Sequence, residues 1–277
     1  MWFVPISRRD GDTKLTSYPS WRDQAPLPPL HRAGQCAAPL VISPHLDDAV
    51  FSCGALLAAI PGSTVCTVFA GAPDKPQRRA WDVAAGFRDS TTAMTIRTRE
   101  DAQALALCGA RAERLSFLDR QYDPLPDDEA IESALVAQLA KCPGAPFVVP
   151  LGLRHPDHRR VAEAWLTLLR SRLIRSCIVY EEAIHRTARG LTEQRLRNLS
   201  DVGLRADALD ATWCPERTSA RATNIKRCSV LAYDSQLRAF GSRVPADLAQ
   251  PERYWHVYWA MTPPAPRTTS SRNPATG

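Results

Sequence analysis

Residues 39–59, PLVISPHLDDAVFSCGALLAA, combine a predicted strand, a polar loop and a predicted helix. The run 39–43 is short, apolar and partly β-branched, which predicts a strand buried on both faces. Residues 48–59 carry apolar side chains around most of a helical circumference, which predicts a buried helix. The polar loop between them therefore follows the end of a strand, where α/β folds bind their ligands.

The alternation of strands and helices continues along the chain. Further strands are predicted at 64–70, 114–118, 147–151 and 177–181, and further helices at 97–108, 128–140, 161–173 and 224–240. Residues 185–223 are polar and rich in arginine, and their pattern gives no assignment. The alternation predicts an α/β fold: a single Rossmann-like domain with a mostly parallel sheet and helices on both faces.

Length and composition predict one folded domain with irregular ends. The chain has 277 residues, of which 44% are hydrophobic and 23% charged, enough for a sizeable core. These values exclude a disordered chain and a disulfide-stapled miniprotein. We expect an N-terminal extension at 1–37, a folded domain at 38–261, and a disordered tail rich in Pro, Ser and Thr at 262–277.

Membrane, secretory and redox signals favour a soluble cytoplasmic protein. The longest apolar run, 49–60, is broken by Ser52 and Gly54 and is shorter than the roughly 20 residues of a transmembrane helix. The opening MWFVPISRRD places its charges after a very short apolar stretch, unlike a signal peptide. The eight cysteines form no CxxC motif, and several lie inside apolar runs, so we expect a reducing compartment.

The charge pattern favours a small-molecule substrate over a nucleic acid. The net charge is +6, and the basic residues are 31 Arg and only 4 Lys, a skew that we attribute to genome composition. Arginine also suits bidentate binding of carboxylate or phosphate, so an anionic substrate stays open. The basic residues are scattered and form no stripe with aromatic side chains, so we expect no nucleic-acid partner.

Two clusters of acids and histidines follow predicted strands. The first, SPHLDD, occupies 43–48, and the second, RHPDH, occupies 154–158 just before a predicted helix. Parallel strands end at the same edge of a sheet, so the two loops can meet there. Six side chains would then surround one point: His45, Asp47, Asp48, His155, Asp157 and His158.

These side chains suit a catalytic zinc site. Zinc takes imidazole nitrogen and carboxylate oxygen, with three protein ligands and a water in catalytic sites. His45 and Asp48, three residues apart, could bind it together with a histidine of the second cluster, which leaves Asp47 to deprotonate the water. The alternative is that each histidine caps a helix or meets a surface acid; this explains one cluster more easily than two.

The same motifs resemble those of the PIG-L/LmbE family of zinc-dependent de-N-acetylases. PHLDD is similar to the family's HPDDE motif, and HPDH to its second motif. Three further segments are similar: RTREDAQALALCGA (97–110), LSFLD (115–119) and, more weakly, YDSQ (233–236). The resemblance covers roughly residues 38–182. Leu46 replaces the usual Pro and Ala49 the usual Glu, which is not a ligand in the pattern.

The resemblance implies a role for each residue. His45, Asp48 and His158 match the zinc ligands, and Asp47 matches the general base. His155 matches the histidine that stabilises the oxyanion and protonates the leaving amine, and Asp157 matches the acid that orients it.

Two arginines beside the motifs are candidates for substrate binding. Arg97 matches an arginine that contacts the polar head of the substrate in some members, with an exposed arginine at a helix start as the alternative. Arg154 precedes the second motif directly and, like Arg97, could pair with an anionic group of the substrate.

The implied activity is removal of the acetyl group from an N-acetylglucosamine-type sugar conjugate. An amidase acting on a thiol conjugate and a catalytically silent sugar- or nucleotide-binding module remain as alternatives. The sequence indicates neither the substrate carrier nor the oligomeric state.

Overall fold

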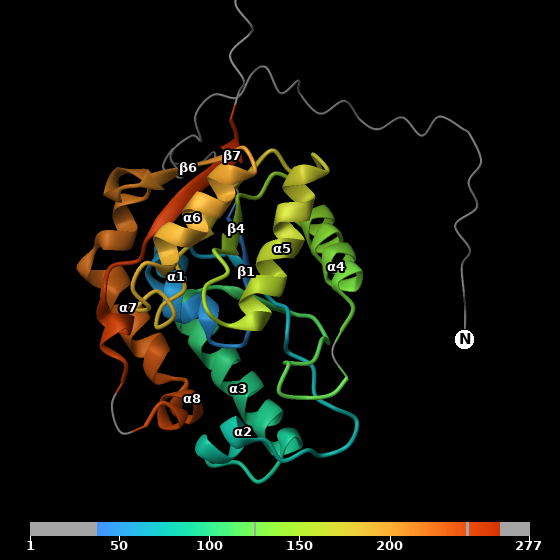
Figure 1. Cartoon of the computed structure of the whole chain (residues 1–277). Coiled ribbons are helices and arrows are strands. Elements are labelled where there is room, and N and C mark those ends of the chain that lie inside the picture. Colours follow the sequence, from blue (N-terminus) through green and yellow to red (C-terminus); the bar gives the residue numbers. More distant parts are fainter. Residues whose placement is uncertain (1–37, 125, 242–243, 261–277) are drawn as a thin grey trace, which may run out of the picture.

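A seven-stranded sheet forms the centre of the molecule (Figure 1). In chain order its strands are β1 (Leu40–Ser43), β2 (Thr64–Thr67), β3 (Arg111–Arg114), β4 (Phe147–Pro150), β5 (Ser176–Tyr180), β6 (Leu204–Leu209) and β7 (Tyr254–Trp259). Their order in the sheet is β3-β2-β1-β4-β5-β7-β6, and the first five of that order run parallel. Strand β7 is antiparallel to both β5 and β6.

The structure is a computed structural model that describes residues 38–124, 126–241 and 244–260. The extension predicted at 1–37 and the tail predicted at 262–277 lie outside the described residues, so both stay predictions. Among the described residues, no helix combines the length and the apolar character that a membrane span requires.

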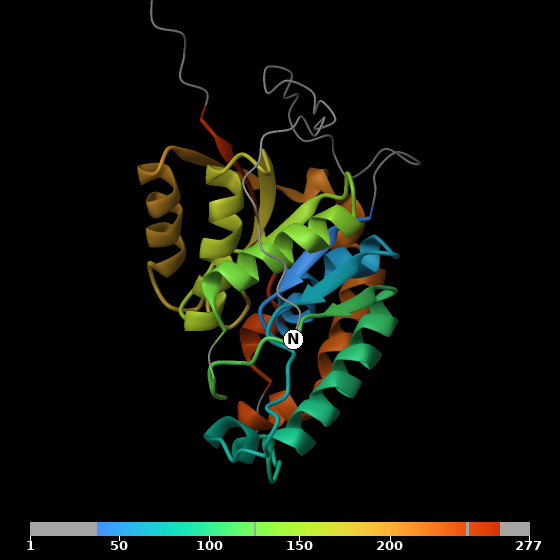
Figure 2. The same cartoon turned by 90° about the vertical axis from the view of Figure 1, so that its right-hand side faces the viewer.

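Helices cover both faces of the sheet. They are α1 (Asp48–Ala59), α2 (Ala80–Ala84), α3 (Ser90–Cys108), α4 (Asp128–Lys141), α5 (Pro156–Arg170), α6 (Leu191–Asp201), α7 (Ala220–Leu231) and α8 (Asp234–Ala239). Figure 2 shows α4, α5 and α6 on one side of the strands and α3 and α7 on the other. Successive residues of β1 serve both layers, because Val41 packs with the α1 side and Ile42 with the α5 side. The predicted fold class, α/β with a mostly parallel sheet, is confirmed.

The predicted strand at 114–118 is wrong in its position. Strand β3 comes earlier, at Arg111–Arg114, and among the described strands it pairs with β2 alone. As an edge strand it is largely exposed, so it lacks the apolar run that marks a buried strand. The apolar residues Leu115 and Phe117 follow it and pack against the core, and Ser116 makes a single bridge with Phe69.

The C-terminal part holds elements that the sequence pattern did not assign. Residues 185–223 contain α6 and β6, and β7 fills the gap between β5 and β6. The helix predicted at 224–240 is two helices, α7 and α8, because Tyr233 leaves the helical conformation at φ −87° and ψ 52°. The described residues of this part also include the short 3₁₀ turns η2 (Ala211–Trp213), η3 (Pro215–Thr218) and η4 (Ala246–Ala249).

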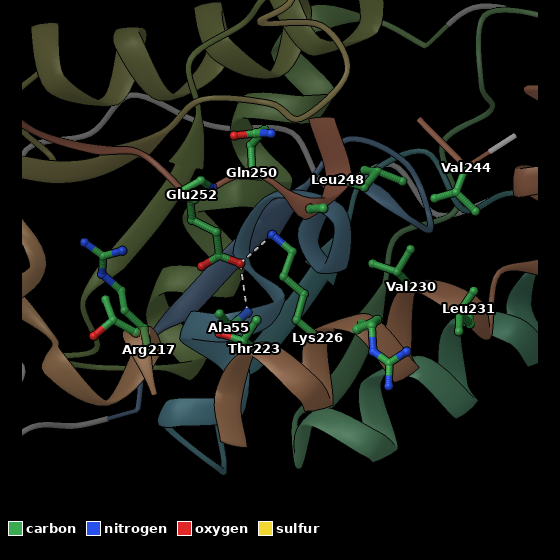
Figure 3. A pocket seen from close by; sticks show the side chains of 14 residues that line it. Ala55, Arg217, Thr223, Lys226, Val230, Leu231, Val244, Leu248, Gln250 and Glu252 are labelled. Atoms are coloured by element: carbon green, nitrogen blue, oxygen red, sulfur yellow. Dashed lines mark hydrogen bonds and ion pairs between the residues drawn. The ribbon is translucent and has the colours of Figure 1, made fainter. Parts of the chain in front are cut away.

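A buried ion pair ties α7 to α1. Lys226 Nζ lies 2.8 Å from Glu252 Oε1, and the Glu252 carboxylate also accepts hydrogen bonds from the backbone N–H groups of Ala55 and Leu56. The pair lies in the wall of a cavity of about 350 Å³ whose lining is mostly apolar (Figure 3). Gly54 is required here, because a Cβ at this position would lie 2.8 Å from Lys226 Cγ.

Replacing Glu252 with Gln is expected to destabilise the protein by about 3–5 kcal/mol, because the Lys226 ammonium would stay buried without a charged partner. The free energy of unfolding in denaturant measures the effect. The matched control is Glu113→Gln, which breaks an exposed ion pair with Lys141 and should cost less than about 1 kcal/mol. Equal losses in the two variants would contradict the role given to the buried pair.

Candidate active site

Both acid–histidine motifs lie at the carboxyl edge of the parallel strands. The first follows β1 and the second follows its neighbour β4 and opens helix α5. The Ser43 hydroxyl shapes the first loop, since it donates to the His45 carbonyl at 2.6 Å and accepts from the Ala49 N–H at 2.9 Å. The Asp48 carboxylate accepts from the His45 N–H at 2.8 Å, which turns this acid toward the histidine.

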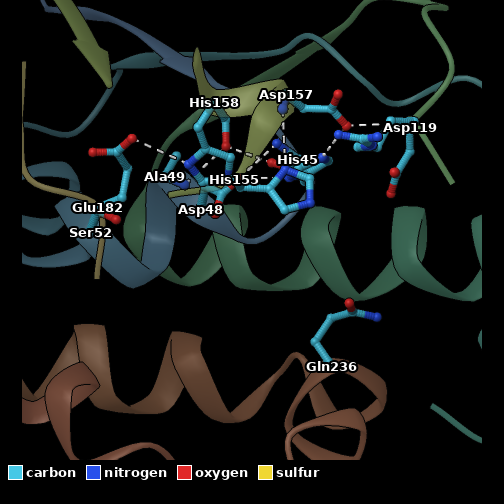
Figure 4. Close-up of polar contacts among 12 residues, drawn as sticks. His45, Asp48, Ala49, Ser52, Asp119, His155, Asp157, His158, Glu182 and Gln236 are labelled. Carbon is cyan, nitrogen blue, oxygen red and sulfur yellow. Dashed lines mark hydrogen bonds and ion pairs between the residues drawn. The ribbon is translucent and has the colours of Figure 1, made fainter. Parts of the chain in front are cut away.

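One carboxylate oxygen lies between two imidazole rings. Asp48 Oδ2 is 3.1 Å from His45 Nδ1 and 3.1 Å from His158 Nε2 (Figure 4). The other ring nitrogen of each histidine meets a second carboxylate: His45 Nε2 lies 3.2 Å from Asp157 Oδ2, and His158 Nδ1 lies 3.3 Å from Glu182 Oε1. Histidines that bind a metal are typically held by a carboxylate in this way.

Electrostatic interactions in the cluster favour positive charge around Asp48. Burial alone would raise the pKa of Asp48, but His158 and His45 hold it well below its usual range. Burial opposes protonation of His158, yet Asp48 and Glu182 raise its pKa to about 9. Burial also opposes protonation of His45, whose pKa is nevertheless raised by Asp119, Asp157 and Asp48. The acids therefore stabilise positive charge on these histidines.

Three overlapping groups of described residues bring possible metal-binding atoms within 4.8 Å of one another. They are His45 with His155 and His158, Asp48 with His158 and His185, and His45 with Asp119 and Asp157. All of them lie at the same sheet edge. The chemistry of the donors, imidazole nitrogen and carboxylate oxygen, suits zinc and similar divalent ions.

Asp47 is a buried acid at the edge of the cluster. Burial and the neighbouring Asp48 raise the pKa of Asp47 to about 6, and the Arg97 guanidinium opposes this rise. A carboxyl group with such a pKa can take up and release a proton near neutral pH.

The two candidate arginines occupy different environments. Arg97 is 4% exposed in the middle of α3, with Nη1 3.7 Å from Asp119 Oδ2, and it lines the cavity at the site. It is therefore no exposed arginine at a helix start. Arg154 is exposed, has a φ of 36°, and is not among the residues that line this cavity.

His155 is held as a neutral imidazole. Its Nδ1 accepts the Asp157 backbone N–H at 3.3 Å at the start of α5, so the ring proton resides on Nε2. Burial and the neighbouring histidines His45 and His158 lower the pKa of His155 to about 4. The fully buried Asp157 carboxylate interacts with His45 and with the Arg120 N–H at 3.0 Å; among the described contacts, it makes none with the His155 ring.

Sequence reasoning missed several residues of the site. Asp119 and Gln236 lie within the segments LSFLD and YDSQ but carried no assigned role; Glu182 and His185 follow β5. The strand-end rule that found the two motifs would have found the second pair, because β5 was predicted. His185 comes after Ile184, which has the unusual φ of 63° and donates its N–H to Asp247 Oδ2 at 2.6 Å.

A cavity of about 270 Å³ opens over the cluster. Trp81 and Phe240 form an apolar wall with ring centroids 5.1 Å apart, and Trp81 Nε1 donates to Gln236 Oε1 at 2.9 Å. The remaining lining residues are His45, Asp47, Asp48, Arg97, Asp119, Arg120, Gln121, His155, His158, Ile184 and His185.

Comparison with known families agrees with the motifs and the site. The family model described as "PIG-L: GlcNAc-PI de-N-acetylase" matches residues 40–169, which include β1, β4 and both motifs. Residues 40–169 of the chain therefore belong to the PIG-L/LmbE-like family of de-N-acetylases. This de-N-acetylase is therefore a hydrolase that acts on carbon–nitrogen bonds.

Solved structures of similar fold include a teicoplanin deacetylase and an A40926 pseudoaglycone deacetylase. The zinc-inhibited form of the teicoplanin deacetylase Orf2 is 20% identical, with a TM-score of 0.67 over 81% of this chain and 99% of that chain. The A40926 pseudoaglycone deacetylase Dbv21 is 24% identical, with a TM-score of 0.62 over 82% of this chain and 99% of that chain. At these identities the likeness supports the fold alone. No curated protein matches the sequence of this de-N-acetylase.

Proposed function

We propose that this de-N-acetylase is a zinc-dependent enzyme that removes the acetyl group from an N-acetylglucosamine-type sugar carried on a conjugate. The observation that carries the proposal is Asp48 Oδ2, which lies 3.1 Å from one imidazole nitrogen of each of His45 and His158. These three side chains would hold the zinc. Zinc bound by three such ligands polarises a carbonyl group and lowers the pKa of a water molecule.

Asp47 would move the proton in this reaction. Its carboxylate accepts the proton of the attacking water and, because its pKa is raised to about 6, can later give that proton to the departing amine. The buried Arg97 guanidinium lowers the pKa of Asp47 and so favours its charged form, which accepts the proton. No Ser or Cys nucleophile is needed.

His155 would stabilise the oxygen of the tetrahedral intermediate. Its Nδ1 is occupied as an acceptor, so Nε2 carries the proton and can donate a hydrogen bond as negative charge develops. Because its pKa is lowered to about 4, the His155 ring would stay neutral near pH 7. It would therefore donate a hydrogen bond from Nε2 and would not deliver a proton to the amine. Both proton-transfer roles, base and acid, therefore fall to Asp47, and His155 supplies a hydrogen bond to the developing oxyanion.

The shape of the cavity supports a sugar with an apolar or aromatic carrier. The rings of Trp81 and Phe240 lie beside the acid–histidine cluster in the cavity wall. Aromatic side chains bury a large apolar area, so these rings could pack against an apolar carrier. One teicoplanin deacetylase of similar fold has been solved with teicoplanin bound. By analogy with that relative, we propose a small-molecule glycoconjugate as the substrate of this chain.

A substrate panel tests the proposal. We expect amine release from N-acetylglucosamine glycosides with apolar carriers, and lower kcat/KM for free N-acetylglucosamine, because the carrier supplies binding energy. The Asp47→Asn variant serves as the matched blank. Release only from N-acylated thiol conjugates would favour an amidase of that kind, and binding without release would favour a silent binding module; either result would overturn the proposed substrate.

We also propose that the protein works in the reducing cytoplasm. Five of the seven cysteines among the described residues are buried free thiols. Cell fractionation should recover the protein with cytoplasmic markers, and recovery in a secreted fraction would contradict this location.

A further inference from the structure

Glu182 is a fully buried acid at the carboxyl end of β5. It is 0% exposed. One of its carboxylate oxygens, Oε1, makes three polar contacts. Oε1 accepts the backbone N–H groups of Gly152 at 2.7 Å and Leu153 at 2.8 Å, and it lies 3.3 Å from His158 Nδ1 (Figure 4). The same atom therefore joins the loop after β4 to the ring of a proposed zinc ligand.

Among the residues that the structure describes, His158 is the only basic side chain that pairs with the Glu182 carboxylate. Among the ion pairs of the described residues, Glu182 pairs with His158 and with no Lys or Arg. Its second oxygen, Oε2, is buried without a hydrogen-bond partner in the part of the chain that the structure describes. Burying a carboxylate without a positive charge nearby lowers the free energy of unfolding. Among the described residues, His158, or a cation bound to it, is placed to supply that charge.

The adjacent acid has a different environment. Glu181 is also buried, at 1% exposed, but it accepts from Trp255 Nε1 at 3.1 Å and lies 3.4 Å from Arg253 Nη1. Both of its partners are supplied by β7 and the residue before it, away from the acid–histidine cluster. A role in packing alone therefore accounts for Glu181, whereas Glu182 contacts the site directly.

The contact at Nδ1 determines how His158 presents its other nitrogen. When Nδ1–H donates to Glu182, the lone pair of His158 lies on Nε2, which faces Asp48 Oδ2 at 3.1 Å. A carboxylate at this position also makes the imidazole a stronger donor to a metal. The backbone N–H groups of Gly152 and Leu153 fix the carboxylate in turn, so the ring cannot rotate freely.

We propose that Glu182 is a positioning residue for the metal: it fixes the tautomer and orientation of His158 and strengthens its bond to the ion. This inference rests on the proposed zinc-dependent function. It concerns a residue outside both sequence motifs, and it assigns the strand-end acid of β5 to the same centre as the loops after β1 and β4.

The test is the zinc affinity of Glu182→Gln, measured by competition with a chromophoric chelator. Glutamine keeps the length of the side chain and an acceptor oxygen but removes the charge. We expect zinc affinity to fall by about 10–100-fold. The matched control, Glu181→Gln, should bind zinc like the wild type. In cobalt-substituted protein, we expect the visible absorption bands to shift in Glu182→Gln and to stay unchanged in Glu181→Gln.

The outcomes separate this inference from the proposed function. A wild-type protein that binds no zinc would overturn the proposed function, and the inference with it. Wild-type zinc binding with equal affinity in Glu182→Gln would overturn the inference alone. If Glu182→Gln does not fold, Glu182→Asp replaces it, because the shorter side chain keeps the charge but withdraws it from the ring. Wild-type affinity in that variant would overturn the inference, and a weaker affinity would support it.

Discussion

Asp47→Asn is expected to lower kcat by about 10²–10⁴-fold while zinc occupancy stays near that of the wild type. Asparagine has nearly the same shape as aspartate but cannot accept the proton of the attacking water. Asp47 is 8% exposed, and the short contacts to His45 Nδ1 and His158 Nε2 are made by Asp48 instead. Steady-state kinetics and metal analysis of the same preparation measure both quantities.

The matched control is Asp48→Asn, which changes the adjacent acid. Because Asp48 Oδ2 lies between the two imidazole rings, this variant should lose zinc affinity and activity together. If Asp47→Asn loses zinc and Asp48→Asn keeps it, the ligand and the base are reversed. A small kcat effect of Asp47→Asn with full zinc content would contradict its role as the base.

The sequence predicts the buried parallel strands because each of them lies in a short run of mostly apolar or β-branched residues. Strand β1 and helix α1 follow from the apolar run and the polar loop of residues 39–59, and α1 spans Asp48–Ala59 as expected. Strands β2, β4 and β5 also lie within or next to their predicted ranges, because a strand covered on both faces reads as an unbroken apolar segment.

Elements at the sides of the sheet are harder to predict. Strand β3 is an exposed edge, and β6 is largely exposed as well, so neither carries the apolar run of a buried strand. Strand β7 pairs antiparallel between β5 and β6, an arrangement set by contacts distant in sequence. Tyr233, which precedes α8, leaves the helical conformation within a segment whose periodicity predicts a single helix. Tertiary contacts, rather than local pattern, determine these parts.

For the site, strand-end reasoning places the two motifs at one edge but leaves the pairing of side chains undetermined. The resemblance implied that Asp157 orients His155, whereas in the structure the Asp157 carboxylate lies 3.2 Å from His45 Nε2. Arg154 adjoins His155 in the sequence yet is exposed outside the lining of the cavity. Neither relation follows from spacing, because side-chain direction depends on backbone geometry such as the φ of 36° at Arg154.

Removal of metal is expected to abolish deacetylation, and zinc is expected to restore it. In the proposed mechanism, the ion would polarise the substrate carbonyl and lower the pKa of the attacking water, and an amide bond is unreactive toward water alone. Metal binding should also stabilise the fold by about 2.7 kcal/mol when free zinc exceeds its dissociation constant 100-fold. Activity and thermal unfolding, each measured after dialysis against a chelator and again after addition of zinc, test the two effects.

His158→Ala should remove both effects together, because it deletes the ring that lies 3.1 Å from Asp48 Oδ2. Added zinc should then restore neither activity nor the rise in unfolding temperature. His256→Ala is the matched control, since His256 lies on β7 and does not line the cavity. It should keep the response to zinc. Full activity of the chelated wild type, verified to be free of metal, would contradict a metal-dependent mechanism even if the fold and the family assignment stand.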